Sequence, residues 1–427
     1  MIRWEYMLSV ANALEELLKS FSVLPSESVS VAKSYGRILS DDILAPFDLP
    51  LFSNSSMDGF AVLAGDLKSA TKEHPVELIV TADIPAGTDQ SLTLRNGQAM
   101  RIMTGAPIPL GSDAVIPVED TNFNHRQPGV KLPPTVLAFK IVKPGENIRP
   151  KGQDVHKGEL VLYAGHILRS QDVGFLSMMG ISKVSVYRKP RVALLSTGDE
   201  LLSVGLPLKP GKIYDANSSI LTSLIVENGG EVIDLGIAPD QDEIIRSRLD
   251  NAISRQADLI LSSAGVSVGA FDFVRKVVEE NGVLAFWKVN MRPGKPLAFG
   301  KYRGVPFAGL PGNPVSAYVG FEVFVRPAIS KMRGLQNWQR PTELVILAEE
   351  IESDGRESYL RAIVYQSDAG LLARLTGHQG SGNLRSLVQS NAFLIVPSEV
   401  KSLPIGTEVK AWITGEIREE KDTQIPI

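Results

Sequence analysis

Small residues, carboxylates and cations recur where apolar runs end in the second half of the chain. Between Asp258 and Val274, the apolar run Leu259–Leu261 leads into a loop of Ser, Ala and Gly, and an amphipathic helical pattern begins just after Asp272. In a parallel α/β sheet such a loop lies at the carboxyl end of its strand, where ligands bind. Small residues let a ligand approach the backbone, and a helix N-terminus offers free N–H groups to an anion. An ordinary N-cap is an equally good local interpretation of Asp272.

Similar side chains follow the neighbouring apolar runs. They comprise acidic or amide residues at two strand ends, two cations held between prolines, and a glycine loop that opens a helix: Asp199, Glu200, Asp215, Asn217, Asp240, Arg292–Pro296 and Gly309–Asn313. Singly, each residue is typical of a helix cap or a solvated turn. Their recurrence at one edge of one sheet favours a phosphate ligand together with Mg²⁺.

Composition excludes several classes of protein. The 427 residues are 44% hydrophobic and carry a net charge of −4, which gives no case for nucleic-acid binding. The chain has no cysteine, so disulfides, thiolate metal sites and cysteine nucleophiles are excluded, and a bound metal would take oxygen ligands. No apolar run approaches the roughly 18 residues of a membrane span, and the N-terminus lacks a signal core, so we expect a cytoplasmic protein. Dinucleotide-binding, P-loop, zinc-protease and serine-hydrolase motifs are absent.

The hydrophobic pattern changes three times along the chain. Residues 9–40 predict helices, the second around Val29–Leu39, and the stretch from Ala45 to about Pro150 predicts a β-rich module. Strand and helix patterns alternate over residues 188–333, which predicts a parallel α/β sheet, and short strands follow from Thr342. The β-rich module contains two polar loops, Asn54–Val62 and Arg101–Pro107, for which simple hairpin turns are as good an interpretation as a binding site.

Taken together, these loops resemble the molybdopterin molybdenumtransferase (MoeA) family, bacterial relatives of the C-terminal (E) domain of gephyrin. The resemblance covers nearly the whole chain and rests on segments in family order: Asn54–Val62, Arg101–Pro107, Gly152–Asp154, Ser196–Glu200, Ser263–Asp272, Pro293–Pro296, Gly309–Pro314 and Gly377–Ser381. It implies an elongated multidomain chain of class α/β plus β. The implied domains are a helical/β linking domain (1–45 and 145–187), an inserted β-rich domain (46–144), an α/β domain resembling molybdopterin-binding domains (188–335) and a C-terminal small β domain (340–420).

The resemblance also implies an activity. Members of the family insert molybdenum, supplied as molybdate, into the dithiolene of adenylylated molybdopterin and release AMP, and they require Mg²⁺. The implied assembly is a homodimer with a shared active site, in which the α/β domain of one subunit meets β domains of the other. The adenylyltransferase of the preceding step is an implied partner, whereas nucleic acid and membranes are not. The pterin supplies the sulfur ligands, which agrees with a chain that has no cysteine.

Matching the family motifs residue by residue assigns expected roles. The implied catalytic residues are Asp58, Thr104, Asp154, Glu200, Asp272 and Lys295. The implied pterin- and phosphate-binding residues are Ser263, Gly265, Ser267, Gly269, Arg292, Pro311, Gly312, Asn313, Arg361 and Ser381. The implied Mg²⁺ ligands are Glu200, Asp240 and Asp272. Arg292 stands where the family commonly has lysine, and a guanidinium binds an oxyanion as a fork where an ammonium acts as a point charge.

Two other functions stay open at this point. Enzymes that adenylylate molybdopterin share the α/β domain and its Ser-Ala-Gly-Val-Ser loop, but they have no need of the β-rich module or the C-terminal domain. A gephyrin-like scaffold that docks partner segments is the non-enzymatic alternative.

Overall fold

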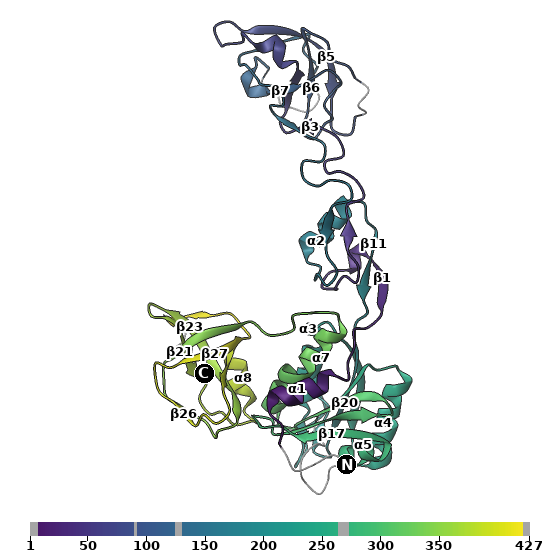
Figure 1. Ribbon diagram of the computed structural model, residues 1–427, viewed down its shortest axis with the longest axis vertical. Helices are drawn as coiled ribbons and strands as arrows, with labels where there is room; N and C mark the ends of the chain where they lie inside the picture. The colour runs from purple at the N-terminus through teal and green to yellow at the C-terminus, as the bar shows by residue number, and fades with distance from the viewer. Residues whose placement is uncertain (1–6, 89–91, 124–129, 264–272, 422–427) are drawn as a thin grey trace. The chain divides into compact units, whose positions relative to one another are not determined.

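The computed structural model describes residues 7–88, 92–123, 130–263 and 273–421 (Figure 1). The chain divides into two compact units: unit 1 comprises residues 1–40, 165–173 and 183–427, and unit 2 comprises residues 41–164 and 174–182. Within the described ranges, every helix is too short or too polar to span a lipid bilayer.

Unit 2 is built around a five-stranded sheet in the order β7-β4-β6-β5-β8. Its strands are β4 (Gly59–Val62), β5 (Val76–Ile84), β6 (Gln98–Ile102), β7 (Ala114–Pro117) and β8 (Thr135–Ala138), with the 3₁₀ turns η2 (Ala64–Leu67) and η3 (Val118–Asp120). Shorter pairs join β3 (Asn54–Ser55) to β9 (Ile148–Arg149) and β2 (Ile43–Leu44) to β10 (Leu160–Leu162). The alternating burial at Leu78 and Val80 in β5 shows how period-two apolar residues turn one face of the sheet to the core. The predicted β-rich character of this stretch is confirmed.

Unit 1 begins with helix α1 (Val10–Leu18), whose N-cap Ser9 accepts a hydrogen bond from the Asn12 amide at 3.2 Å. The predicted second helix around Val29–Leu39 is wrong. The chain instead forms β1 (Ser26–Ser30), paired antiparallel with β11 (Lys183–Tyr187), and a 3₁₀ turn η1 (Val31–Lys33). Serines and valines alternate here, and pairing with a strand more than 150 residues away overrides a weak local helix pattern. Helix α2 (Ser170–Met178) begins in unit 1 and ends in unit 2.

The α/β part of unit 1 has a six-stranded sheet in the order β15-β12-β16-β20-β19-β17. Its strands are β12 (Arg191–Thr197), β15 (Glu231–Ala238), β16 (Leu259–Ser263), β17 (Gly282–Lys288), β19 (Pro296–Tyr302) and β20 (Val305–Leu310), and β13 (Leu201–Leu202) pairs separately with β14 (Ile213–Tyr214). The first four strands of the order run parallel, as predicted, but β19 and β17 are antiparallel. The turn at Arg303 and Gly304, both with positive φ, joins β19 directly to β20, and such a tight connection allows only antiparallel pairing.

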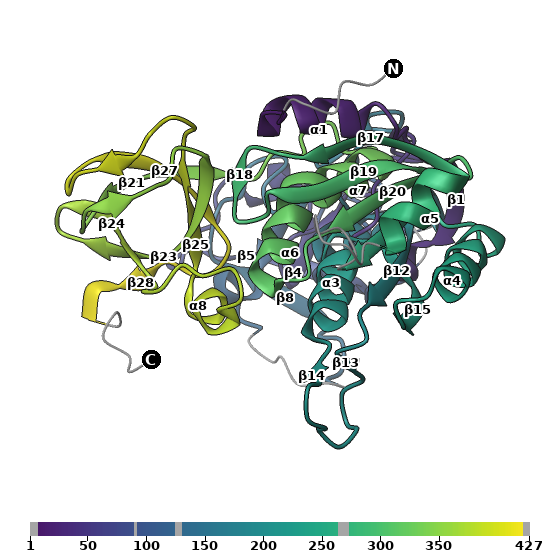
Figure 2. The ribbon, with the colours of Figure 1, turned by 90° about the horizontal axis from the view of Figure 1, so that it is seen from below.

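Helices cover both faces of this sheet (Figure 2). They are α3 (Ala216–Glu227), α4 (Asp242–Ser254), α5 (Phe273–Asn281), α6 (Pro314–Gly320) and α7 (Arg326–Met332), with a π-helical turn η4 (Phe321–Val325) between α6 and α7. Apolar residues of α1, α3, α6 and α7 share one core cluster with the sheet, and those of α4 and α5 share another.

The C-terminal part of unit 1 is a closed ring of five strands in which β23 pairs with β24, β24 with β21, β21 with β27, β27 with β25, and β25 again with β23. The strands are β21 (Thr342–Leu347), β23 (Glu357–Ser367), β24 (Gly370–Leu375), β25 (Ala392–Val396) and β27 (Glu408–Ile413). Accessory elements are β18 (Met291–Arg292), β22 (Ile351–Glu352), α8 (Leu384–Gln389), β26 (Ser402–Leu403) and β28 (Arg418–Glu419). Tyr318 of α6 stacks on Phe393 of β25 with ring centroids 5.7 Å apart, so this ring and the α/β sheet share one core.

Candidate functional site

Arg292 lies where the α/β sheet and the C-terminal ring are joined. The segment between β17 and β19 forms the short strand β18, which pairs in parallel with β23 so that Met291 faces Glu357 and Arg292 faces Ser358. The guanidinium of Arg356 donates a hydrogen bond from Nη1 to the Met291 carbonyl at 3.1 Å and fixes the same junction. Arg292, which lies in the segment between two strands of the α/β sheet, is thereby paired with a strand of the C-terminal ring.

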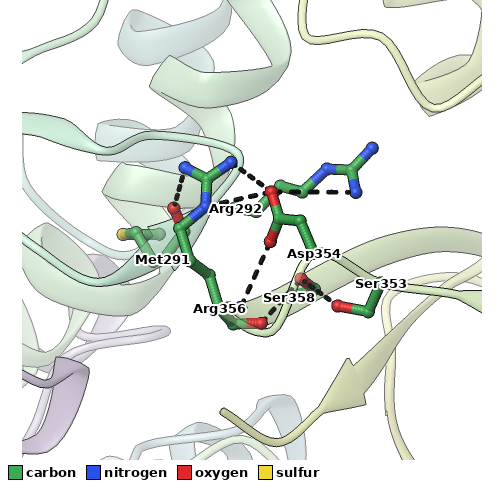
Figure 3. Close-up of polar contacts among 6 residues, drawn as sticks. All are labelled: Met291, Arg292, Ser353, Asp354, Arg356 and Ser358. Atoms are coloured by element: carbon green, nitrogen blue, oxygen red, sulfur yellow. Dashed lines mark hydrogen bonds and ion pairs between the residues drawn. The ribbon is translucent and has the colours of Figure 1, made fainter. Parts of the chain in front are cut away.

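Asp354 and Arg356 form a tight pair next to Arg292 (Figure 3). Arg356 donates to the Asp354 carboxylate from Nε at 3.0 Å, from Nη2 at 2.5 Å and from its backbone N–H at 3.1 Å. Nη1 of Arg292 lies 4.0 Å from Oδ2 of the same carboxylate, which is an ion pair without a hydrogen bond. The hydrogen bonds from Arg356 and, to a smaller extent, the charge of Arg292 hold the pKa of Asp354 below its ordinary value.

Arg361, four residues after the start of β23, is fully buried. Its guanidinium donates to Ser386 Oγ at 3.1 Å and to the carbonyl oxygens of Gly380 at 3.0 Å and His378 at 3.4 Å. Burial, and then the positive charge of Arg292, lowers its pKa to about 10. None of the carboxylates that the structure describes forms an ion pair with Arg361. Its hydrogen bonds go to neutral acceptors, so the charge of Arg361 is not neutralised by a carboxylate of the described chain and adds positive potential at this junction.

The glycine loop after β20 is tied to the C-terminal part by Ser381. Asn313 donates from Nδ2 to Ser381 Oγ at 2.9 Å, and the backbone N–H of Val315 donates to the Ser381 carbonyl at 3.1 Å. On the other side, Asn217 of α3 donates from Nδ2 to the Gly312 carbonyl at 2.7 Å. Pro311 of this loop is buried, whereas Gly312 and Asn313 are exposed. The structure therefore brings together Asn313 and Ser381, two residues that the sequence placed in one site.

Lys295 is exposed and lies directly before β19. Its backbone carbonyl accepts a hydrogen bond from the Val289 N–H at 3.1 Å, which closes the loop that contains β18. Gly294, with a φ of 108°, precedes it in a backbone conformation that L-residues rarely adopt. The loop that positions Arg292 thus also positions Lys295.

Carboxylates gather at the ends of β12 and β15. The backbone N–H of Asp240 donates to Asp199 Oδ1 at 3.3 Å. Burial, followed by the negative charges of Asp199 and Glu200, raises the pKa of Asp240 above its ordinary value. No group of three or more acidic or histidine residues within the described ranges is arranged to hold a metal ion. Four predicted site residues, Gly265, Ser267, Gly269 and Asp272, lie outside those ranges, whereas Ser263 is described and buried at the end of β16. The predicted Mg²⁺ ligand set therefore stays a prediction.

In unit 2, Asp58 and Thr104 are in direct contact. Oδ1 of Asp58 accepts two hydrogen bonds from Thr104, one from the backbone N–H and one from Oγ1, both at 2.8 Å. Any side chain at Gly59 would collide with the Ile116 carbonyl, so the tight pairing of β4 with β7 requires glycine directly after Asp58. The two polar loops of the sequence are therefore more than separate hairpin turns.

Asp154 belongs to a third loop of unit 2. Arg149 donates from Nη2 to Asp154 Oδ2 at 2.5 Å, and both side chains are roughly half exposed. Arg149 lies in β9 opposite Asn54 of β3, and the Ser56 N–H donates to the Asn147 carbonyl. This places the loop before Asp154 beside the loop that leads to Asp58.

Asp354 and Arg356 were not among the site residues predicted from the sequence. Ser-Asp-Gly-Arg reads as an ordinary turn, and its importance follows only from the pairing of β18 with β23. The signal that could have drawn attention to it is a pair of opposite charges around a glycine, immediately before the strand that carries Arg361.

Comparisons with known proteins agree over the whole chain. Three family models match: the MoeA N-terminal region (domain I and II) over residues 8–180, a probable molybdopterin binding domain over residues 193–331, and the MoeA C-terminal region (domain IV) over residues 345–414. The chain is 37% identical over 407 residues to the molybdopterin molybdenumtransferase of Haemophilus influenzae, which covers 94% of this chain and 98% of that protein. It is 37% identical over 392 residues to molybdopterin molybdenumtransferase 2 of Mycobacterium tuberculosis, covering 90% and 94%. A crystal structure of the molybdopterin biosynthesis MoeA protein from Pyrococcus horikosii superposes with a TM-score of 0.79 at 33% identity and covers 96% of this chain and 100% of that one.

Proposed function

The chain belongs to the MoeA family of molybdopterin molybdenumtransferases, and from this premise we propose that it transfers molybdenum from molybdate into adenylylated molybdopterin and releases AMP. The observation that carries the proposal is the cationic group of Arg292 and Arg361, which lies where β18 pairs with β23. Arg361 is buried without a carboxylate partner among the described residues, and Arg292 lies near enough to lower its pKa. Such a pair suits a dianion such as molybdate or a phosphate.

Charge neutralisation and positioning are what this reaction needs from the protein. The bond between the two phosphates breaks and AMP leaves, so negative charge must be stabilised on both fragments. Lys295 and Arg292 would neutralise it, because both belong to the loop that is closed by the Val289 and Lys295 backbone hydrogen bond. Asn313 and Ser381 would orient the pterin and its phosphate through the hydrogen-bonded loop ends.

Asp199, Glu200 and Asp240 at the ends of β12 and β15 form an acidic corner, which suits a hard divalent cation. Burial, followed by repulsion from Asp199 and Glu200, raises the pKa of Asp240, and a bound cation would relieve that repulsion. Glu200 and Asp240, together with Asp272, would hold the Mg²⁺ that the resemblance implies. When bound, the ion would supply charge stabilisation to the phosphate oxygens.

Asp58 and Thr104 would act on the same substrate from unit 2. The double hydrogen bond fixes the Asp58 carboxylate through Oδ1, and within the described residues Oδ2 accepts no hydrogen bond from the protein. A carboxylate fixed in this way can accept a proton or a hydrogen bond from a molybdate-bound or attacking oxygen. Asp154 would help to position the loop that leads to Asp58, because its carboxylate binds Arg149, which lies opposite Asn54.

A substrate-pairing assay tests the proposal against its nearest alternative. We expect the purified protein to release AMP from adenylylated molybdopterin only when molybdate is added, and to form no adenylylated product from ATP and molybdopterin. The opposite pattern would assign the preceding adenylylation step. Absence of both reactions, with intact folding and measurable binding of peptide segments, would favour the gephyrin-like scaffold.

The proposal includes the homodimer with a shared active site and the adenylyltransferase of the preceding step as a partner, both implied by the resemblance. It also includes the cytoplasmic location that we expect from the sequence. Mixing two inactive variants tests the shared site. If Asp58→Asn and Lys295→Gln chains pair at random, half of the dimers are mixed and each has one intact site, so about a quarter of the wild-type activity should return. No recovery, with mixed dimers demonstrated by affinity tags, would contradict a shared site.

A further inference from the structure

Arg292 and Arg356 contact Asp354, and a third arginine, Arg361, interacts electrostatically with Arg292; the three differ in how many of their donors are used by the protein. All three guanidinium nitrogens of Arg356 donate to protein acceptors: Nε and Nη2 to the Asp354 carboxylate, and Nη1 to the Met291 carbonyl. Arg361 is buried and bonded to Ser386 Oγ and two carbonyl oxygens. Arg292 donates no hydrogen bond to any described residue, and its one charged contact is the 4.0 Å approach to Asp354. Of the three, Arg292 therefore has the most donors left for a ligand, and it lies at ion-pair distance from the Asp354 carboxylate.

Asp354 does not need Arg292 for its own stabilisation. Three hydrogen bonds from Arg356 already hold the carboxylate, and the largest cause of its lowered pKa is that pair. The side chain of Asp354 is 38% exposed and that of Arg292 is 36% exposed, so solvent and small ions reach both. The contact between them can therefore be broken without leaving a buried charge unpaired.

We propose that Asp354 is a built-in counter-ion for Arg292, held in place by Arg356, and that it competes with the oxyanion for this guanidinium. The proposal rests on the proposed function only in taking a tetrahedral oxyanion as the ligand. In the absence of that anion the carboxylate partly neutralises Arg292 and keeps it near Arg361, whose like charge would otherwise repel it. When the oxyanion binds, it makes the hydrogen bonds that Asp354 does not make.

Arg356 has the opposite effect to Asp354 on how strongly Arg292 attracts an oxyanion. Because it holds Asp354 through three hydrogen bonds, it keeps the carboxylate at ion-pair distance instead of letting it form a bidentate pair with Arg292. Asp354 and Arg356 are thus positioning residues that set how strongly Arg292 attracts an anion. Removing one or the other should change oxyanion affinity in opposite directions.

The test is the affinity of the full-length protein for molybdate, measured by calorimetry without pterin, with sulfate as a second tetrahedral dianion. Removing one negative charge about 4 Å from Arg292 in Asp354→Asn should tighten molybdate binding about fivefold at low ionic strength. In about 1 M salt the Debye length is roughly 3 Å, so the difference should largely disappear. Arg356→Gln should weaken binding several-fold, because Asp354 can then close on Arg292.

Asp368→Asn is the matched control. Asp368 is exposed in the turn after β23, roughly 30 Å along the strand from Arg292, and the substitution makes the same change in net charge. It should leave molybdate affinity unchanged. Thermal melts check that each variant folds, and if Asp354→Asn does not fold, weakened binding in Arg356→Gln still supports the proposal and unchanged binding overturns it.

Two results would overturn the counter-ion role: equal affinities for Asp354→Asn and Asp368→Asn, or weaker binding in Asp354→Asn than in wild type. AMP release from the same preparations separates this failure from failure of the proposed function. If the wild-type protein releases AMP but Asp354→Asn binds molybdate with wild-type affinity, only the counter-ion role of Asp354 is contradicted. A protein that releases no AMP contradicts the transferase activity, whatever the binding data show.

Discussion

The cationic group of unit 1 and the Asp58–Thr104 pair of unit 2 are preorganised in different ways. In unit 1, segments far apart in sequence meet by strand pairing and loop contacts, as Arg292 does with Ser358 and Asn313 with Ser381. In unit 2, one carboxylate is fixed by two hydrogen bonds from a single threonine. The first arrangement presents positive charge with few acidic partners, and the second presents negative charge with one oxygen fixed. In the function that we propose, unit 1 would bind the anion, and unit 2 would handle oxygen atoms and protons during transfer.

The largest expected effect comes from removing a cation of unit 1. Lys295→Gln should slow AMP release by about 10²–10³-fold, because charge on the departing phosphate loses a stabilising partner. The measurement is single-turnover AMP release at saturating adenylylated molybdopterin. Lys301→Gln changes an exposed lysine in β19, the strand that follows Lys295, and should behave as wild type. Equal rates in both variants would remove Lys295 from the site.

A smaller effect should follow in unit 2. Asp58→Asn keeps an acceptor for the Thr104 donors, so unit 2 should fold normally while AMP release falls about 10–10²-fold. Asp66→Asn is the control, because Asp66 in the same unit also accepts a backbone N–H, that of Gly97 at 2.8 Å. If the Asp66 variant loses as much activity as the Asp58 variant, the Asp58 effect is one of stability alone.

The smallest effect concerns the acidic corner of unit 1. The pKa of Asp240 is raised in the folded protein, so its stabilising contribution is present below the ordinary pKa of 3.8 and is lost as pH rises through the raised value. Asp240→Asn should therefore raise Tm by about 1–2 °C at pH 7 in metal-free buffer, and the difference should vanish near pH 3. Added Mg²⁺ should raise the Tm of wild type more than that of the variant. Equal shifts with Mg²⁺ would exclude Asp240 as a ligand.

Local patterns in the sequence predicted much of the fold. The alternation of strands and helices predicted the α/β sheet over residues 188–333, because short buried apolar runs ended by glycine loops or helix caps leave few alternatives. The helix predicted around Val29–Leu39 failed because its segment is a strand whose partner, β11, is distant in sequence. The antiparallel edge formed by β19 and β17 also depends on pairing that periodicity does not encode.

The same contrast applies to the candidate site. The sequence singled out Arg292, Arg361, Asp58 and Thr104, and the structure brings Asp58 to Thr104 and Arg292 close to Arg361. The sequence did not indicate that Arg361 is fully buried, because its burial follows from its place in a closed ring of strands. Asp354 and Arg356 were missed for the same reason, since their roles come from contacts with Met291 and Arg292 more than 60 residues away.

The central claim is that the cations of unit 1 and the carboxylate of unit 2 act on the same chemical step. The most direct test is the single-turnover rate of AMP release in Asp58→Asn, Lys295→Gln and the double variant. Groups that stabilise one transition state together are strongly non-additive, so the double variant should be about as slow as the slower single variant. A double variant slowed by the product of the two single effects would contradict the claim.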